Sequence, residues 1–201
     1  ISTDYNPELK RSECLAVKNF KAGEQIFIFY GPRSNAELFI HNGFVFQDNQ
    51  HDGFWLHLGM SKSDQLKEKR SQLLLKLYLP DYKEFWLKKC EIPISGQLLA
   101  FSRIFNMDEE QIQYWVKNSN VESLEDLNCN IEAGFQTKCW NFLLTRLKLI
   151  LSTYKTNLEE DDNILSDKQL PRNKCLAVQM RATEKRILHH TIDYIKKQLK
   201  N

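Results

Sequence analysis

The residue types that most often carry chemistry occur in this sequence without the spacings of familiar metal or nucleophile motifs. No Cys-x-x-Cys pair occurs, and no histidine has a partner at a metal-ligand spacing. The chain also lacks a Walker loop, a Gly-x-Gly-x-x-Gly turn and a His-Glu-x-x-His helix. The pattern therefore predicts no metal site, and spacing alone assigns no Cys-His catalytic pair. The cysteines are Cys14, Cys90, Cys129, Cys139 and Cys175.

One tyrosine stands where chemistry could take place. In the stretch "EQIFIFYGPRSNAELFIHNGF", the β-branched and aromatic residues of Gln25–Tyr30 predict a strand that is buried on both faces. This strand ends at Tyr30, directly before Gly31. A strand that only packs does not need a tyrosine beside a glycine at its end. We therefore expect something to lie against this corner, and the alternative is an ordinary core tyrosine.

The composition describes an ordinary globular chain. Of its 201 residues, 42% are hydrophobic and 27% are charged, and the formal net charge is +2. This small charge does not call for a surface that binds nucleic acid along its phosphates. No apolar run approaches the roughly 20 residues of a membrane span. The odd number of unpaired cysteines favours reduced thiols in the cytoplasm or the nucleus.

Short β-patterned runs predict strands in the first part of the chain. Glu13–Val17, Gln25–Tyr30 and Phe54–Leu58 are the candidates. Between the last two, Ser34-x-x-Glu37 is a capping box that starts a short helix, and Gly43 is placed to end it.

After about residue 59 the hydrophobic period becomes helical. The predicted helices are Asp64–Leu79, Gly96–Phe105, one that Asp108 caps, Phe135–Tyr154 and one that Pro171 opens. The acidic run Glu159–Asp162 is interpreted as the solvated start of a helix. The sequence thus predicts an α+β protein, with a small β-rich part followed by an all-helical domain.

Four blocks of sequence resemble one protein family. "AGEQIFIFYGPRSNAELFIHNGF" is similar to the C-terminal end of the SET domain of protein methyltransferases. "LGMSKSDQL", "PISGQLLAFSRIF" and "STYKTNLEED" resemble the subclass in which a helical domain follows SET, as in the Rubisco large-subunit methyltransferase. Within that subclass, the blocks most resemble the members that methylate a histidine of actin. Together they extend over nearly the whole chain.

The resemblance implies a division into two domains. Residues 1–58 would be the C-terminal part of a SET domain, and residues 59–201 a helical, Rubisco methyltransferase-like substrate-binding domain. The Gly-rich cofactor loop and the Asn-His motif of the family do not occur in this sequence. We therefore expect the chain to be the C-terminal part of the enzyme, inactive by itself.

The resemblance also implies roles for single residues. Tyr30 matches the active-site tyrosine at the methyl-transfer channel, and Phe44 matches the aromatic residue that packs on the adenine of S-adenosyl-L-methionine. Asn42 falls at a cofactor-contacting position, where a close relative has serine. Arg33 matches a substrate-facing arginine. The segment Ile1, Ser2 and Thr3 falls where the family holds its substrate, with Ser2 in place of a threonine.

The activity that this resemblance implies is S-adenosylmethionine-dependent methylation of a histidine of actin. We expect a monomer in the cytoplasm, and also in the nucleus, with no nucleic acid, membrane or metal as a partner. Two alternatives stay open. One is a protein-lysine methyltransferase of the same architecture, and the other is a non-catalytic helical binding module from a truncated form.

Overall fold

The computed structural model describes residues 2–200, and for Ser2 it describes the backbone alone. The chain divides into two compact units, residues 1–33 and residues 34–201. The domain boundary predicted between residues 58 and 59 stays a prediction. In the second unit, a strand over residues 53–59 pairs with a strand over residues 82–88, so the pairing extends across that position.

The first unit contains one antiparallel pair of strands. β1 (Ser2–Asn6) pairs with β2 (Arg11–Leu15), so that Thr3 lies opposite Cys14. The predicted strand Glu13–Val17 overlaps β2 but ends two residues too late.

The predicted strand Gln25–Tyr30 does not form, and this prediction was wrong for the structure. The segment is irregular, and its rings are exposed rather than buried: Phe27 is 71% exposed and Phe29 79%. A strand exists only where another strand accepts and donates its backbone hydrogen bonds. Among the described residues, none pairs with this segment.

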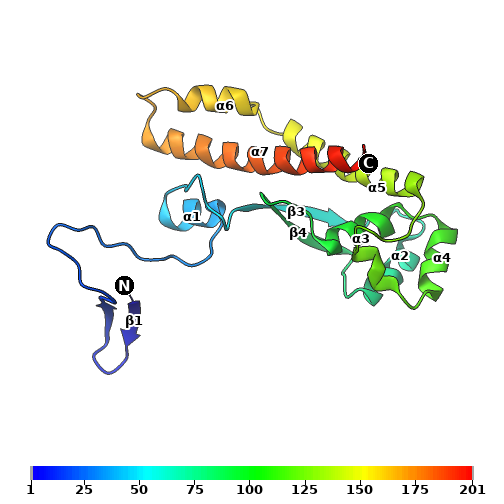
Figure 1. The fold of residues 1–201 in the computed structure, drawn as a ribbon, viewed down its shortest axis with the longest axis horizontal. Coiled ribbons are helices and arrows are strands. Elements are labelled where there is room, and N and C mark those ends of the chain that lie inside the picture. The colour runs from blue at the N-terminus through cyan, green and yellow to red at the C-terminus, as the bar shows by residue number, and fades with distance from the viewer. Residues whose placement is uncertain (1, 201) are drawn as a thin grey trace. The chain divides into compact units, whose positions relative to one another are not determined.

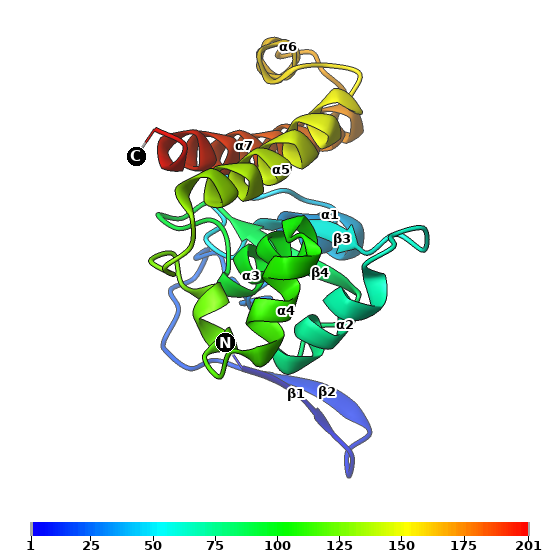
Figure 2. The same ribbon diagram turned by 90° about the vertical axis from the view of Figure 1, so that its right-hand side faces the viewer.

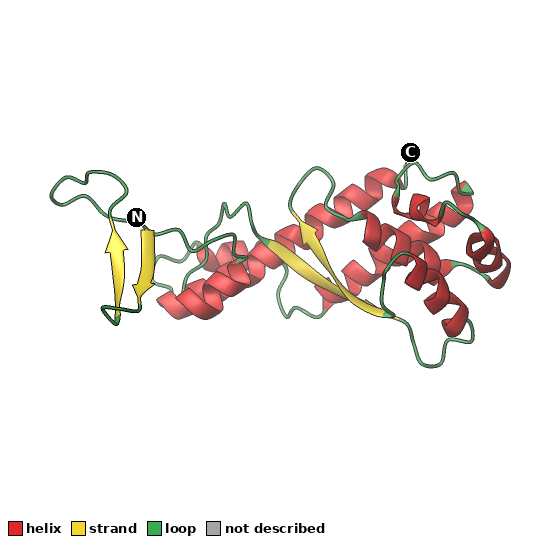
Figure 3. Cartoon of the chain, turned by 90° about the horizontal axis from the view of Figure 1, so that it is seen from below, coloured by secondary structure: helices red, strands yellow, loops and turns green. Residues whose placement is uncertain are grey.

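The second unit is mostly helical, with one small sheet (Figures 1 and 3). Its elements, in chain order, are α1 (Asn35–Asn42), β3 (Gly53–Gly59), α2 (Lys67–Lys76), β4 (Tyr82–Lys88), α3 (Gly96–Asn106), α4 (Glu109–Lys117), the 3₁₀ helix η1 (Val121–Glu125), α5 (Ala133–Ser152), α6 (Leu158–Leu165) and α7 (Arg172–Gln198).

Residues 59–201 were predicted to be all-helical, and β4 corrects that prediction. β3 and β4 are antiparallel, with Trp55 opposite Trp86 and Leu56 opposite Phe85. Side chains alternate between the two faces of such a pair. Leu56, Phe85 and their neighbours on the same face are buried, whereas Trp55 on the other face is half exposed.

The predicted helices are present, with shifted ends. The helix predicted over Asp64–Leu79 is shorter in the structure, where α2 is capped by Leu77. The helical conformation ends there because Tyr78 takes a left-handed φ of 54°. The capping boxes at Ser34 and Asp108 both form. The final helix begins after Pro171, as predicted.

The core of the second unit lies between the helices and the inner face of β3–β4. α7 runs beside α5 and α6 and contacts both strands (Figure 1). Figure 2 shows α2, α3 and α4 grouped together, and α3 also contacts α5. The stripes predicted on α5 and α7 supply buried residues to this core, namely Trp140, Leu143, Leu147, Leu188, Ile192 and Ile195.

Candidate functional site

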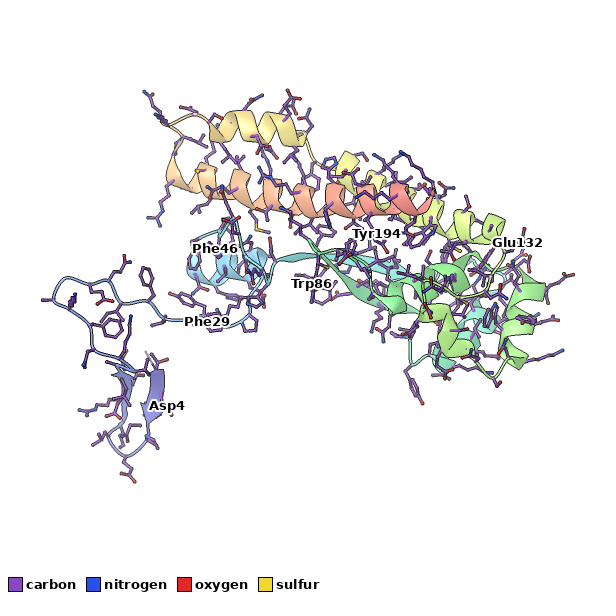
Figure 4. The ribbon with its side chains drawn as sticks, in the orientation of Figure 1. Asp4, Phe29, Phe46, Trp86, Glu132 and Tyr194 are labelled. Atoms are coloured by element: carbon purple, nitrogen blue, oxygen red, sulfur yellow. The ribbon has the colours of Figure 1, made fainter. Side chains whose placement is uncertain are left out.

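Tyr30 and Arg33 lie at the end of the first unit, in a turn. Tyr30 is 42% exposed and Arg33 is partly buried. Gly31 between them has a φ of 82°, a left-handed conformation that a residue with a Cβ adopts only under strain. The predicted corner is therefore present as a turn, although the strand expected to lead into it is not. Figure 4 shows Phe29 projecting from this irregular segment.

The segment predicted to bind the substrate lies at the start of the chain. Ile1 is outside the described residues. Ser2 and Thr3 begin β1, and Thr3 is exposed. The structure thus places Thr3 on a solvated strand, and its role in substrate binding stays a prediction.

Asn42 and Phe44, the predicted cofactor residues, flank the end of α1 in the second unit. Ser34 caps the start of this helix: its Oγ accepts from Glu37 N at 3.3 Å, and Glu37 Oε2 accepts from Ser34 N at 2.8 Å. Gly43 ends the helix with a φ of 70° and donates its N–H to Phe39 O at 3.2 Å.

Two residues whose side chains could bind a ligand flank Gly43 in the sequence. Asn42 and Phe44 are both half-buried, and one residue separates them. An aromatic ring offers a face for stacking, and an amide offers both a donor and an acceptor. Such a pair has the chemistry needed to hold a planar base such as adenine.

A buried hydrogen-bond network lies directly beside this turn, and the sequence analysis missed it. Asn35, the first residue of α1, binds both the carboxylate of Asp52 and the backbone of Phe46. Asn35 is fully buried and Asp52 nearly so. Figure 4 marks Phe46 beside α1. The available signal was an Asn immediately after a cap serine and an Asp immediately before a strand.

Burial raises the pKa of Asp52 above its ordinary value. Its bonds from the backbone and side chain of Asn35, and from Gly53 N, oppose the rise without cancelling it. These hydrogen bonds replace the contacts with water that the buried carboxylate of Asp52 has lost.

Two other features bear on the kind of site. Within residues 2–200, no group of three or more His, Cys, Asp or Glu side chains is arranged to hold a metal ion. Among the helices that the structure describes, none is both long and apolar enough to span a bilayer.

A family model described as Rubisco LSMT substrate-binding matches residues 61–188 of the chain. Curated relatives extend the similarity further. An actin-histidine N-methyltransferase of Rhinolophus ferrumequinum is 40% identical over 210 residues, covering 99% of this chain and 35% of the relative. The corresponding protein of Danio rerio is 43% identical over 196 residues, covering 96% and 33%. The chain thus spans about a third of the length of these relatives.

Solved structures share the fold. A structure of Rubisco LSMT bound to AdoMet superposes with a TM-score of 0.77 at 21% identity, over 89% of this chain and 42% of that one. A structure of the SET domain of LSMT bound to lysine and AdoHcy gives a TM-score of 0.75, also at 21% identity, over 89% and 40%. The mixed fold with a helical substrate-binding part, predicted from the sequence, is confirmed by this likeness.

Proposed function

Because the chain belongs to the Rubisco LSMT substrate-binding family, we propose that it is the C-terminal part of a protein methyltransferase that uses S-adenosylmethionine and acts on a histidine side chain of actin. The observation that carries this proposal is the alignment of nearly the whole chain with curated actin-histidine N-methyltransferases. The complete enzyme, below, means this chain together with the remaining part that its relatives carry.

In this proposal Phe44 stacks on the adenine of the cofactor and Asn42 hydrogen-bonds near it. Both are partly exposed and lie on either side of Gly43, which ends α1. When bound, S-adenosylmethionine would supply an electrophilic methyl group on a sulfonium: the N–C bond would form as the S–C bond breaks, the electron pair would stay on sulfur, and the methylated imidazole would release the proton of its other nitrogen to solvent.

Tyr30 lies, in this proposal, where the target nitrogen and the methyl group meet. Catalysis of such a displacement is mostly alignment and exclusion of water. The ring of Tyr30 would provide an aromatic wall, and its one hydroxyl would orient the incoming group. Arg33, two residues past the left-handed Gly31, is proposed to face the substrate, together with the segment Ile1–Thr3.

The target side chain decides what the enzyme has to do. A neutral imidazole, with an ordinary pKa of about 6.5, is already a nucleophile at pH 7. A lysine amine, with an ordinary pKa of about 10.4, must first lose a proton. A site that aligns rather than deprotonates its target suits histidine. We propose that the protein works as a monomer in the cytoplasm, and also in the nucleus, where its five unpaired cysteines would stay reduced.

Mass spectrometry of the product tests the target. The complete enzyme is incubated with actin and with S-adenosylmethionine that carries a deuterated methyl group, and fragment ions locate the label. We expect the label on a histidine. A label on lysine would establish the alternative, a lysine methyltransferase of the same architecture. No label, with intact cofactor binding, would overturn both and favour a non-catalytic binding module.

We further propose that the 201-residue chain does not transfer methyl groups by itself. The Gly-rich cofactor loop and the Asn-His motif of the family do not occur in this sequence, and the segment that leads into Tyr30 pairs with no other strand among residues 2–200. Turnover by the purified chain would contradict this expectation.

A further inference from the structure

Asn35 is the centre of a hydrogen-bond network in which every polar group of its side chain is used. It makes five hydrogen bonds while 0% of it is exposed. Its N–H donates to Asp52 Oδ1 at 2.8 Å, and its Nδ2 donates to Asp52 Oδ2 at 2.8 Å. Nδ2 also donates to Phe46 O at 2.9 Å, and Oδ1 accepts from Phe46 N at 3.0 Å.

These bonds fasten the segment after α1 to the start of that helix. Phe46 is held through both of its backbone groups, in the way that a strand neighbour would hold it. Asn49 adds a bond from Nδ2 to Asn35 Oδ1 at 3.4 Å. Asp52 closes the loop, since its own N–H donates to Asn49 O at 3.1 Å. The chain from Gly43 to Asp52 therefore returns to Asn35 at three points, which are Phe46, Asn49 and Asp52.

The start of α1 does not need Asn35 for capping, because Ser34 and Glu37 already form a complete capping box. Burying an amide is costly unless all of its groups are bonded. The bonds of Asn35 go to a backbone segment and to the carboxylate that braces it, instead of to the helix. The network thus fixes the path of the chain just after Phe44, where both backbone groups of Phe46 bind the start of α1.

We infer that Asn35 and Asp52 are positioning residues for the cofactor: they hold residues 43–46 so that the ring of Phe44 presents its face to the adenine. The inference rests on the proposed function, since it deepens the assignment of Phe44. It assigns roles to two residues that touch neither the methyl group nor the target nitrogen.

Exchanging the two side chains tests this inference in the complete enzyme. Asn35→Asp removes both Nδ2 donors and places two carboxylates in contact. The double variant Asn35→Asp/Asp52→Asn restores a donor between positions 35 and 52, but Phe46 O still lacks its donor. The two variants therefore separate general stability from the path of the loop.

The dissociation constant of S-adenosylmethionine is measured by isothermal titration, and melting of the unliganded protein is measured in parallel. We expect Asn35→Asp to weaken binding at least tenfold and to lower the melting temperature. In the double variant the melting temperature should largely recover, while binding stays several-fold weaker than in the wild type. At saturating cofactor, kcat should change little, because the loop acts on binding and not on the target nitrogen.

Ser102→Ala is the matched control. Ser102 is buried in α3 and donates from Oγ to Cys139 O at 3.1 Å, far along the chain from α1. Its loss should lower the melting temperature and leave the dissociation constant unchanged. If Asn35→Asp does not fold, Asp52→Asn is the milder substitute, because it keeps the shape of the side chain.

The inference is overturned if the double variant recovers its affinity together with its melting temperature, or if Asn35→Asp melts earlier but binds as the wild type does. Phe44→Ala separates this failure from that of the proposed function. If Phe44→Ala binds normally, the assignment of the cofactor residue fails, and this inference falls with it. If Phe44→Ala binds weakly while the Asn35 variants bind normally, the positioning role alone is wrong.

Discussion

Lys185 on α7 donates a hydrogen bond from Nζ to Oδ2 of Asp161 on α6 over 2.6 Å, and neither side chain is more than 1% exposed. Arg181 binds the other carboxylate oxygen, from Nε to Oδ1, at 2.8 Å. Burial by itself would raise the pKa of Asp161, but the bonds from Arg181, Lys185 and Thr156 outweigh it and lower the pKa. This cluster joins the last two helices.

Asp161→Ala should therefore destabilise the chain strongly, because it leaves the ammonium of Lys185 buried without a counter-charge. Removing one partner of a buried pair typically costs about 3–5 kcal/mol. Urea unfolding of the 201-residue chain, followed by its helical circular dichroism signal, measures the free energy of unfolding. Glu159→Ala, on the exposed side of the same helix, is the control and should change it by less than about 0.5 kcal/mol. Equal effects of the two variants would show that the pair contributes nothing.

The same carboxylate shows where sequence reasoning stopped. The run Glu159–Asp162 was expected to be solvated, and three of its members are, but Asp161 is buried. Its partner Lys185 lies 24 residues further along the chain, on another helix. Periodicity identifies helices, but it does not say which acid on one helix meets which base on the next.

Features that depend on neighbouring residues in the sequence were predicted correctly, whereas features that depend on distant residues were not. The cap of α1 at Ser34 and its end at Gly43 depend on neighbouring residues, so the sequence suffices. The strand predicted over Gln25–Tyr30 depends on a pairing partner, which no local pattern specifies. β4 was missed although Phe85 and Leu87 alternate with exposed or half-exposed residues, because the surrounding helical period dominated the interpretation.

The candidate site follows the same division. Resemblance to the family proposed Tyr30, Phe44, Asn42 and Arg33, and these assignments remain predictions. The bonds among Asn35, Phe46 and Asp52 join positions up to 17 residues apart, and their geometry became visible in the structure alone.

Glu184 offers a pH-dependent prediction. It accepts a hydrogen bond from Tyr154 OH at 2.8 Å. Burial raises its pKa, and the negative charge of Asp52 adds to the rise, whereas the Tyr154 bond opposes it. In the folded protein Glu184 thus keeps its proton to a higher pH than in the unfolded chain, where it titrates near about 4.3. Its contribution to stability therefore falls as the pH rises from about 4.3 through the raised folded pKa.

Glu184→Gln keeps an acceptor for Tyr154 but never ionises. Relative to the wild type, the variant should gain stability between pH 4.5 and neutral pH, and the two should differ least at the acidic end. Melting temperatures of both proteins at intervals across roughly this range give the difference. Glu159→Gln is the control for replacing an exposed glutamate by glutamine, because Glu159 is exposed. A difference that does not change with pH, or that changes in the opposite direction, would contradict the prediction.

Phe44→Ala in the complete enzyme should weaken the binding of S-adenosylmethionine by about 1–2 kcal/mol, from lost stacking and lost apolar contact. Isothermal titration measures the change. Phe46→Ala is the control, because the network uses the backbone of Phe46 and its ring is 56% exposed. Unchanged affinity in a folded Phe44→Ala protein would make Phe44 a packing residue.

Tyr30→Phe tests the proposed methyl-transfer position, because it removes the hydroxyl and keeps the ring. If that hydroxyl shapes the channel, kcat of the complete enzyme should fall while cofactor affinity stays nearly the same. Losing one well-aimed polar contact in a dry site typically costs about 1–3 kcal/mol, or roughly ten- to hundredfold in rate. Tyr30→Ala should be slower still, since it also opens a cavity beside the channel.

Single-turnover rates on actin at saturating cofactor, taken together with melting curves, separate a catalytic Tyr30 from a structural one. Tyr30 is 42% exposed, and Tyr30→Phe keeps its ring, so the substitution removes no buried apolar area. Tyr30→Phe should therefore leave the melting temperature almost unchanged. An unchanged rate in this variant would show that the hydroxyl of Tyr30 has no role in methyl transfer. A loss of melting temperature with a normal rate would instead assign its hydroxyl to the packing of the complete enzyme.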